Sequence, residues 1–104
     1  MTLKQIEKLI ERVVGVASQA YPTGDSRPEE LRTLGKELQS SVDRQQRKTI
    51  LLEIKRFLSA GMGGFMDAPL LPPVGMEFGE FSLFYSALVG ELYVAVEKEL
   101  AEGA

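Results

Sequence analysis

Apolar residues recur every three or four positions along most of this chain, which is the spacing of one face of an α-helix. The first such stretch carries its apolar residues at Leu3, Ile6, Leu9, Ile10, Val13, Val14, Ala17 and Ala20. Thr2, followed three residues later by Gln5, forms a capping box that satisfies backbone donors of a first helical turn. The spacing therefore predicts a helix over residues 2–20, which ends where Tyr21 precedes Pro22.

Two further helices are predicted in the middle of the chain, over residues 27–42 and from about residue 44 to Gly61. The apolar stripe of the first consists of Leu31, Leu34, Leu38 and Val42. That of the second consists of Ile50, Leu51, Ile54, Phe57 and Leu58. Gly35 lies inside the first of these helices and is predicted to weaken it, because glycine costs a helix about 1 kcal/mol relative to alanine.

Both of these helices begin with a pair of residues that resembles an N-terminal cap. Ser26 with Glu29, and Asp43 with Gln46, stand three positions apart, so the first side chain can accept a bond from the first turn and the second can reach back. No residue between positions 40 and 44 forces a break. The pattern therefore leaves open whether the two helices are separate or form one bent rod.

The last part of the chain combines a long loop with the most apolar helix. Residues 61–79 hold five glycines and three prolines together with several Met, Leu and Phe side chains, and a loop of this kind is commonly functional or packed onto the domain. From Glu80 to the terminator Gly103 the helical spacing returns, with apolar positions at Phe81, Phe84, Tyr85, Leu88, Leu92, Ala95, Val96 and Leu100. The expected fold is an all-α, single-domain bundle of about four helices over residues 1–104, with the Gly- and Pro-rich loop between helices three and four.

Two residue types that enzymes commonly use for catalysis are absent. The 104 residues include no His and no Cys, which excludes disulfides, the usual structural zinc sites and the commonest catalytic base. Carboxylates remain, and two pairs lie close along the chain, Glu77 with Glu80 and Glu97 with Glu102. A catalytic pair needs burial or a like-charged neighbour to shift one pKa toward neutrality, whereas these glutamates fall on the predicted water-facing side of a helix. We therefore expect no catalysis, no cofactor and no bound metal.

Charge is distributed unevenly, which is more informative than the net charge of −3. Residues 44–56 contain five basic residues and one acid, a local +4, whereas residues 77–104 contain six acids and one base, a local −5. An acidic chain is a poor ligand for nucleic acid, because that binding depends on neutralising phosphate. An acidic helix beside an apolar loop instead suits a basic protein partner. The candidate partner-binding residues are Asp67, Met76, Glu77, Glu80 and Glu91.

The N-terminal residues do not form a signal peptide, because charged side chains recur every few positions up to Arg12. The sequence has no run of eighteen apolar residues, so a membrane span is not expected. A chain without cysteine and without an export signal is most simply cytoplasmic, and we expect it to act there without a membrane partner.

A short motif after the third predicted helix resembles the signature of a family of small bacterial helical domains of unknown function. That signature reads Gly, Met, Gly, Ser, Phe or Leu, Asn, Asp, and this chain has Gly61, Met62, Gly63, Gly64, Phe65, Met66 and Asp67. It departs from the signature at Gly64 and Met66. In physical terms we expect a tight helix exit at the glycines, a core position for Phe65 and backbone bonds to Asp67, which is a structural role.

The small size, acidity, helical make-up and lack of catalytic side chains are also similar to immunity proteins of bacterial toxin systems, including contact-dependent growth inhibition. This resemblance implies a monomeric cytoplasmic inhibitor that binds a toxin domain, often a nuclease, and occludes its positively charged active site. The alternative is a helical interaction or regulatory module that forms a homodimer through the Met-rich loop or the last helix. An enzyme would need a buried carboxylate with a strongly raised pKa in a concave pocket.

Overall fold

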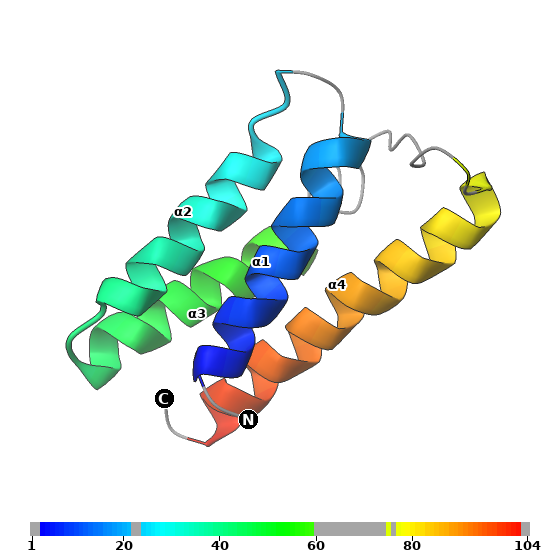
Figure 1. Ribbon diagram of the computed structural model, residues 1–104. Helices are drawn as coiled ribbons and strands as arrows, with labels where there is room; N and C mark the ends of the chain where they lie inside the picture. Colours follow the sequence, from blue (N-terminus) through cyan, green and yellow to red (C-terminus); the bar gives the residue numbers. More distant parts are fainter. Residues whose placement is uncertain (1–2, 22–23, 60–74, 76, 103–104) are drawn as a thin grey trace.

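A computed structural model describes residues 3–21, 24–59, 75 and 77–102 of the chain. Every regular element in these residues is a helix, and the helices are α1 (Leu3–Ala20), α2 (Arg27–Ser40), α3 (Arg44–Ser59) and α4 (Phe78–Ala101) (Figure 1). The predicted all-α bundle of four helices is thereby confirmed. Most of the predicted Gly- and Pro-rich loop, with its motif at residues 61–67, lies outside the described residues.

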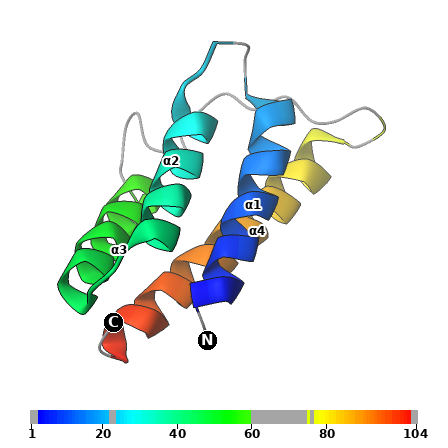
Figure 2. The ribbon, with the colours of Figure 1, turned by 60° about the vertical axis from the view of Figure 1, so that its left-hand side comes forward.

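The helices run alternately up and down and form a ring in which each packs mainly against two neighbours (Figures 1 and 2). α1 packs against α2 and α4, and α3 packs against the same two helices from the other side. α4 is the longest, with 24 residues, and spans about 36 Å at 1.5 Å per residue. None of the described helices is long and apolar enough to cross a membrane.

One hydrophobic core joins all four helices, and most of the side chains predicted to face it are buried. Its members are Ile6, Leu9, Ile10, Val13, Val14, Ala17, Tyr21, Leu31, Leu38, Ile50, Leu51, Ile54, Leu58, Phe81, Tyr85, Leu88, Val89, Leu92, Ala95 and Val96. Two predicted core positions are wrong. Val42 is 87% exposed because α2 ends at Ser40, before the stripe reaches it, and Phe84 is 42% exposed because it lies at the edge of the buried side of α4.

Helices α2 and α3 are separate, which answers the question that the sequence left open. The backbone of Ser41 is extended, with φ −64° and ψ 135°, and so breaks the helical path. Asp43 Oδ1 then accepts a hydrogen bond of 2.7 Å from the N–H of Gln46, as predicted for a cap of α3. The Gln46 side chain reaches back at 3.1 Å to the N–H of Val42, one residue before the expected position.

The predicted cap of α2 is wrong by one residue. Ser26 already has helical backbone angles, φ −83° and ψ −10°, and its side chain makes no capping bond. Asp25 does this instead, because its Oδ1 accepts a 2.9 Å bond from the N–H of Arg27. Glu29, expected to complete a capping box, pairs with Arg32 on the surface. The corresponding Thr2–Gln5 pair of α1 cannot be compared, since Thr2 lies outside the described residues.

Gly35, predicted to be a weak point of α2, is buried at the contact between α1 and α2. A Cβ atom at this position would lie 3.1 Å from Cγ2 of Ile10, closer than ordinary van der Waals contact. The missing side chain therefore lets the two helices approach, and this packing compensates for the low helix propensity of glycine. Gly15 on α1 has no such role, because a Cβ there would meet nothing within 4 Å.

Replacing these two glycines should have opposite effects on stability. Gly35→Leu overfills the α1–α2 contact and should lower the free energy of unfolding by about 1–3 kcal/mol. Gly15→Ala adds helix propensity in open space and should raise it by up to about 1 kcal/mol. Urea unfolding followed by circular dichroism measures both, and a stability unchanged in Gly35→Leu would contradict the proposed close contact.

The position of the α2 cap at Asp25 leads to a prediction about stability. Asp25→Ala removes an N-terminal capping acceptor and should cost about 1 kcal/mol, whereas the neighbouring Ser26→Ala should leave stability nearly unchanged. Thermal unfolding of both variants beside the unmodified chain compares them directly. Equal losses from the two substitutions would show that the serine hydroxyl, and not the aspartate, caps the helix.

Candidate functional site

Three of the five large apolar side chains that are exposed in the described part of the chain lie on α4. α4 is the most apolar of the four helices, and its apolar residues are spread around it more evenly than in the others. Its inner side enters the core, yet Leu83 is 76% exposed and Val94 is 48% exposed on the outer side, with the partly exposed Phe84 beside them. A helix that is apolar on both sides is normally covered on both sides.

Four residues form a regular row along this face, and we call them the outer seam: Leu83, Ala87, Gly90 and Val94. All four are exposed. They follow one another at intervals of four, three and four residues, which is the spacing at which one helix meets another in a coiled coil. Two of them are small, and a Cβ at Gly90 would meet nothing within 4 Å. The middle of the outer seam is therefore open to close approach by another backbone.

The acidic residues predicted to bind a partner fall partly on this face. Glu80 and Glu91 are exposed and lie beside the outer seam, at intervals that place them on the same side of α4. Glu77 is exposed where the helix begins, and its carbonyl accepts a 2.9 Å bond from the N–H of Phe81. The other two predicted residues, Asp67 and Met76, lie outside the described residues.

Sequence reasoning missed the apolar part of this surface. The apolar stripe predicted for this helix includes Phe84 and omits Leu83 and Val94, because it covers one side of the helix. The signal was present in the sequence as a second row with helical spacing on the opposite side.

One glutamate of α4 is occupied by a contact with α3. Oε2 of Glu97 lies 3.5 Å from Nζ of Lys55, and the same ammonium group lies 5.8 Å from the ring centre of Tyr93. This contact joins α3 to α4 and pairs one positive charge of α3 with one negative charge of α4. Glu80 and Glu91 make no ion pair within the described residues, so their charges remain available on the outer face.

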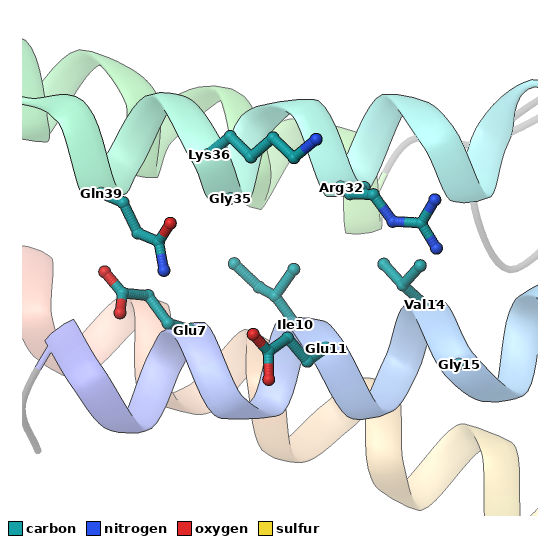
Figure 3. A pocket seen from close by; sticks show the side chains of 9 residues that line it. All are labelled: Glu7, Ile10, Glu11, Val14, Gly15, Arg32, Gly35, Lys36 and Gln39. Atoms are coloured by element: carbon teal, nitrogen blue, oxygen red, sulfur yellow. The ribbon is translucent and has the colours of Figure 1, made fainter.

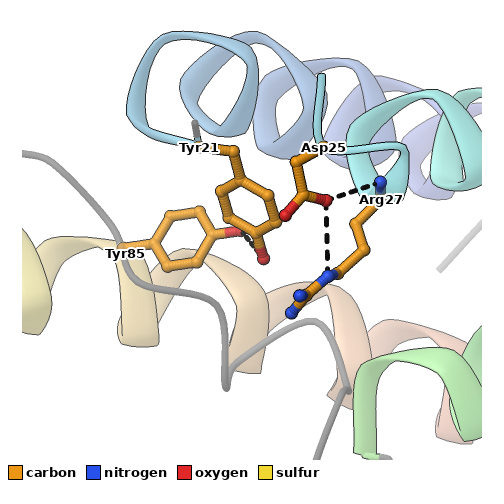
Figure 4. A network of polar contacts seen from close by, with 4 residues as sticks. All are labelled: Tyr21, Asp25, Arg27 and Tyr85. Atoms are coloured by element: carbon orange, nitrogen blue, oxygen red, sulfur yellow. Dashed lines mark hydrogen bonds and ion pairs between the residues drawn. The ribbon is translucent and has the colours of Figure 1, made fainter. Parts of the chain in front are cut away.

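A polar network joins α1, the start of α2 and α4 at the opposite side of α4 (Figure 4). The hydroxyl of Tyr85 donates a long bond of 3.5 Å to the hydroxyl of Tyr21, and the ring of Phe81 stacks on Tyr85 at 5.8 Å. Asp25 accepts bonds from the backbone N–H and, at 3.3 Å, from Nε of Arg27, whose guanidinium lies 5.8 Å from the Tyr21 ring. These contacts hold three elements together.

The two tyrosines in this network resist ionisation. Burial raises the pKa of Tyr85 far above its ordinary value of 10.0, and the bond to Tyr21 raises it further. Burial also raises the pKa of Tyr21, although its hydrogen bond with Tyr85 works in the opposite direction. Neutral phenols that are buried and bonded to each other contribute to stability and offer no nucleophile at neutral pH.

A groove of about 270 Å³ runs between α1 and α2 (Figure 3). Its rims carry opposite charges, with Glu7 and Glu11 on α1 and Arg32 and Lys36 on α2. Its lining also includes Ile10, Val14, Gly15, Gly35 and Gln39. Gly15 contributes open space to this groove, because a Cβ there would meet nothing within 4 Å. No charged residue in the described part of the chain is buried, so the groove contains no sequestered group that would select a ligand.

The described residues include no group of three or more acidic side chains placed to hold a metal ion. Comparisons of this chain with protein-family models, with curated proteins and with solved structures find no match.

The buried tyrosine pair should make the protein sensitive to alkali. Above pH 10 the unfolded chain loses phenolic protons that the folded chain keeps, so the free energy of unfolding should fall by about 1.4 kcal/mol per pH unit for each buried tyrosine. Below pH 10 both states are protonated and the stability contribution is complete. Tyr85→Phe should flatten this alkaline decline, as measured by urea unfolding at a series of pH values.

Tyr93→Phe is the matched control for this experiment, because it removes a phenol outside the network and should keep the steep decline. A decline equally steep in Tyr85→Phe and in the unmodified chain would show that the buried phenol of Tyr85 does not control alkaline stability.

Proposed function

We propose that this protein is an immunity protein that binds a cognate bacterial toxin domain and occludes its active site, without catalysing a reaction itself. The observation that supports the proposal is the outer face of α4, where Leu83, Phe84 and Val94 are exposed beside the carboxylates of Glu80 and Glu91. An apolar centre with charged residues at its edge is the usual composition of a protein-binding surface.

The apolar residues supply the affinity in this proposal. Fully burying a Leu, Phe or Val side chain that is otherwise exposed contributes about 1.5–3 kcal/mol, so three such residues account for a useful share of a stable complex. α4 runs the whole length of the bundle, which gives room for an interface of standard size, about 1,600 Å² in total. A binding role also explains why so apolar a face lies next to water in the isolated chain.

The acidic residues select the partner. A nuclease must attract phosphate, so its active site is basic, and a surface carrying Glu80 and Glu91 complements it electrostatically. Residues 77–104 have a local charge of −5 from six acids and one base, which also steers a basic protein toward this side of the molecule. The encounter takes place in the cytoplasm, where an incoming nuclease would find its substrates.

The proposal predicts that charge reversal on α4 removes protection. Cells that express the toxin domain encoded beside this gene should grow when this chain is co-expressed, and Glu80→Lys with Glu91→Lys should abolish that growth by placing positive charge against a basic site. In a binding assay the same double variant should associate at least tenfold more slowly, and association of the unmodified proteins should slow as salt rises.

Glu30→Lys is the matched control, because Glu30 is an exposed glutamate of α2, the helix that packs mainly against α1 and α3. This variant should protect normally. If no neighbouring gene encodes a toxin-like domain and co-expression gives no protection, the proposed function is wrong. Protection that survives reversal of both α4 charges would show that another surface binds the toxin.

A further inference from the structure

The outer seam has a property that binding to a toxin does not require, namely that it complements itself when a second copy is turned by 180°. Leu83 and Val94 lie equally far on either side of the midpoint between Ala87 and Gly90. Two antiparallel α4 helices centred on this midpoint would therefore place Leu83 opposite Val94 of the second copy, and Ala87 opposite Gly90 of the second copy. We infer that two copies of this chain pair in this way through the outer seam.

The sizes of the side chains suit this register. Opposite each other at the centre, alanine and glycine allow two helix axes to approach to about 8 Å, the short end of the usual range. At either side of this contact the larger Leu83 and Val94 fill the space where the helices diverge. The four residues of the outer seam follow one another at intervals of four, three and four residues. This is the spacing with which the side chains of one helix insert between those of another.

The charges at the two ends of α4 fit the same register. Glu80 and Lys98 lie at nearly the same distance from the midpoint, because the two distances differ by one residue, or about 1.5 Å along the helix. Each Glu80 would then face Lys98 of the second copy, and the two-fold symmetry makes this contact twice. Both residues are exposed, and neither makes an ion pair with another described residue. A parallel arrangement would place like residues opposite each other and lose both pairs.

The pairing also extends the proposed function, and this part of the inference rests on it. A dimer through the outer seam covers the surface that the toxin needs, so toxin and second copy compete for one face. In the absence of toxin the dimer would bury the apolar outer face of α4, and the toxin would bind the dissociated chain.

Light scattering and sedimentation equilibrium of the purified full chain test the pairing without any partner. The unmodified protein should show a reversible dimer of twice the 11.5 kDa chain mass. Leu83→Glu should give a monomer with unchanged helix content, because this side chain is exposed and its replacement disturbs no core contact. Val42→Glu replaces an even more exposed apolar residue away from α4 and should leave the dimer intact.

Charge exchange tests the register. Glu80→Lys and Lys98→Glu should each weaken the dimer about tenfold, because each turns two attractive contacts into repulsive ones. An equimolar mixture of the two variants should recover dimers, since both contacts are attractive again in the mixed pair. The chain that carries both substitutions should also dimerise as the unmodified protein does.

A chain that is monomeric at every concentration overturns the inference, as does a dimer that survives Leu83→Glu. A dimer that Leu83→Glu removes but that the charge variants leave unaffected, or that their mixture fails to restore, overturns the antiparallel register and the inference with it. A monomer that still protects cells would leave the proposed function in place. A dimer that gives no protection would leave the pairing in place and contradict the proposed function.

Discussion

The burial of the inner side of α4 against α1 and α3 is the interaction on which the other features depend. Phe81, Tyr85, Leu92 and Val96 are almost fully enclosed, and they fix the rotation of the helix about its own axis. Once this rotation is set, the 3.6-residue period directs Leu83 and Val94 away from the core. The exposed apolar face is thus a geometric consequence of how the core is filled, combined with a helix that is apolar on both sides.

Much of the fold could be predicted from the sequence, because helical spacing alone identifies which residues are buried together. The limits of the helices were predicted to within two residues where they can be compared, since α2 ends at Ser40 instead of Val42 and α4 begins at Phe78 instead of Glu80. The separation of α2 and α3 could not be predicted, because it depends on the extended backbone of Ser41, for which the side chain gives no signal.

The errors have a common physical cause, which is that a residue's role depends on contacts with other elements. Gly35 is unfavourable for an isolated helix and favourable beside Ile10. Tyr21 follows the end of α1, as predicted, yet it is also buried, because Tyr85 of a distant helix lies against it. On the candidate surface, the acidic residues Glu80 and Glu91 could be identified from charge alone. The apolar residues beside them could be identified only as a second row with helical spacing, since a single exposed leucine and a core leucine look the same in a sequence.

The ring of helix contacts has a consequence for the order in which the chain folds. Three of its four contacts join helices that follow one another in the sequence, and such local pairings lose little entropy when they form. The contact between α1 and α4 joins the two most distant helices and closes the ring. Until it forms, the apolar side of α1 that faces α4 is open to water, and such exposed apolar surface makes a folding chain prone to aggregation. Formation of the contact between α1 and α4 is therefore the step that completes the enclosure of the core.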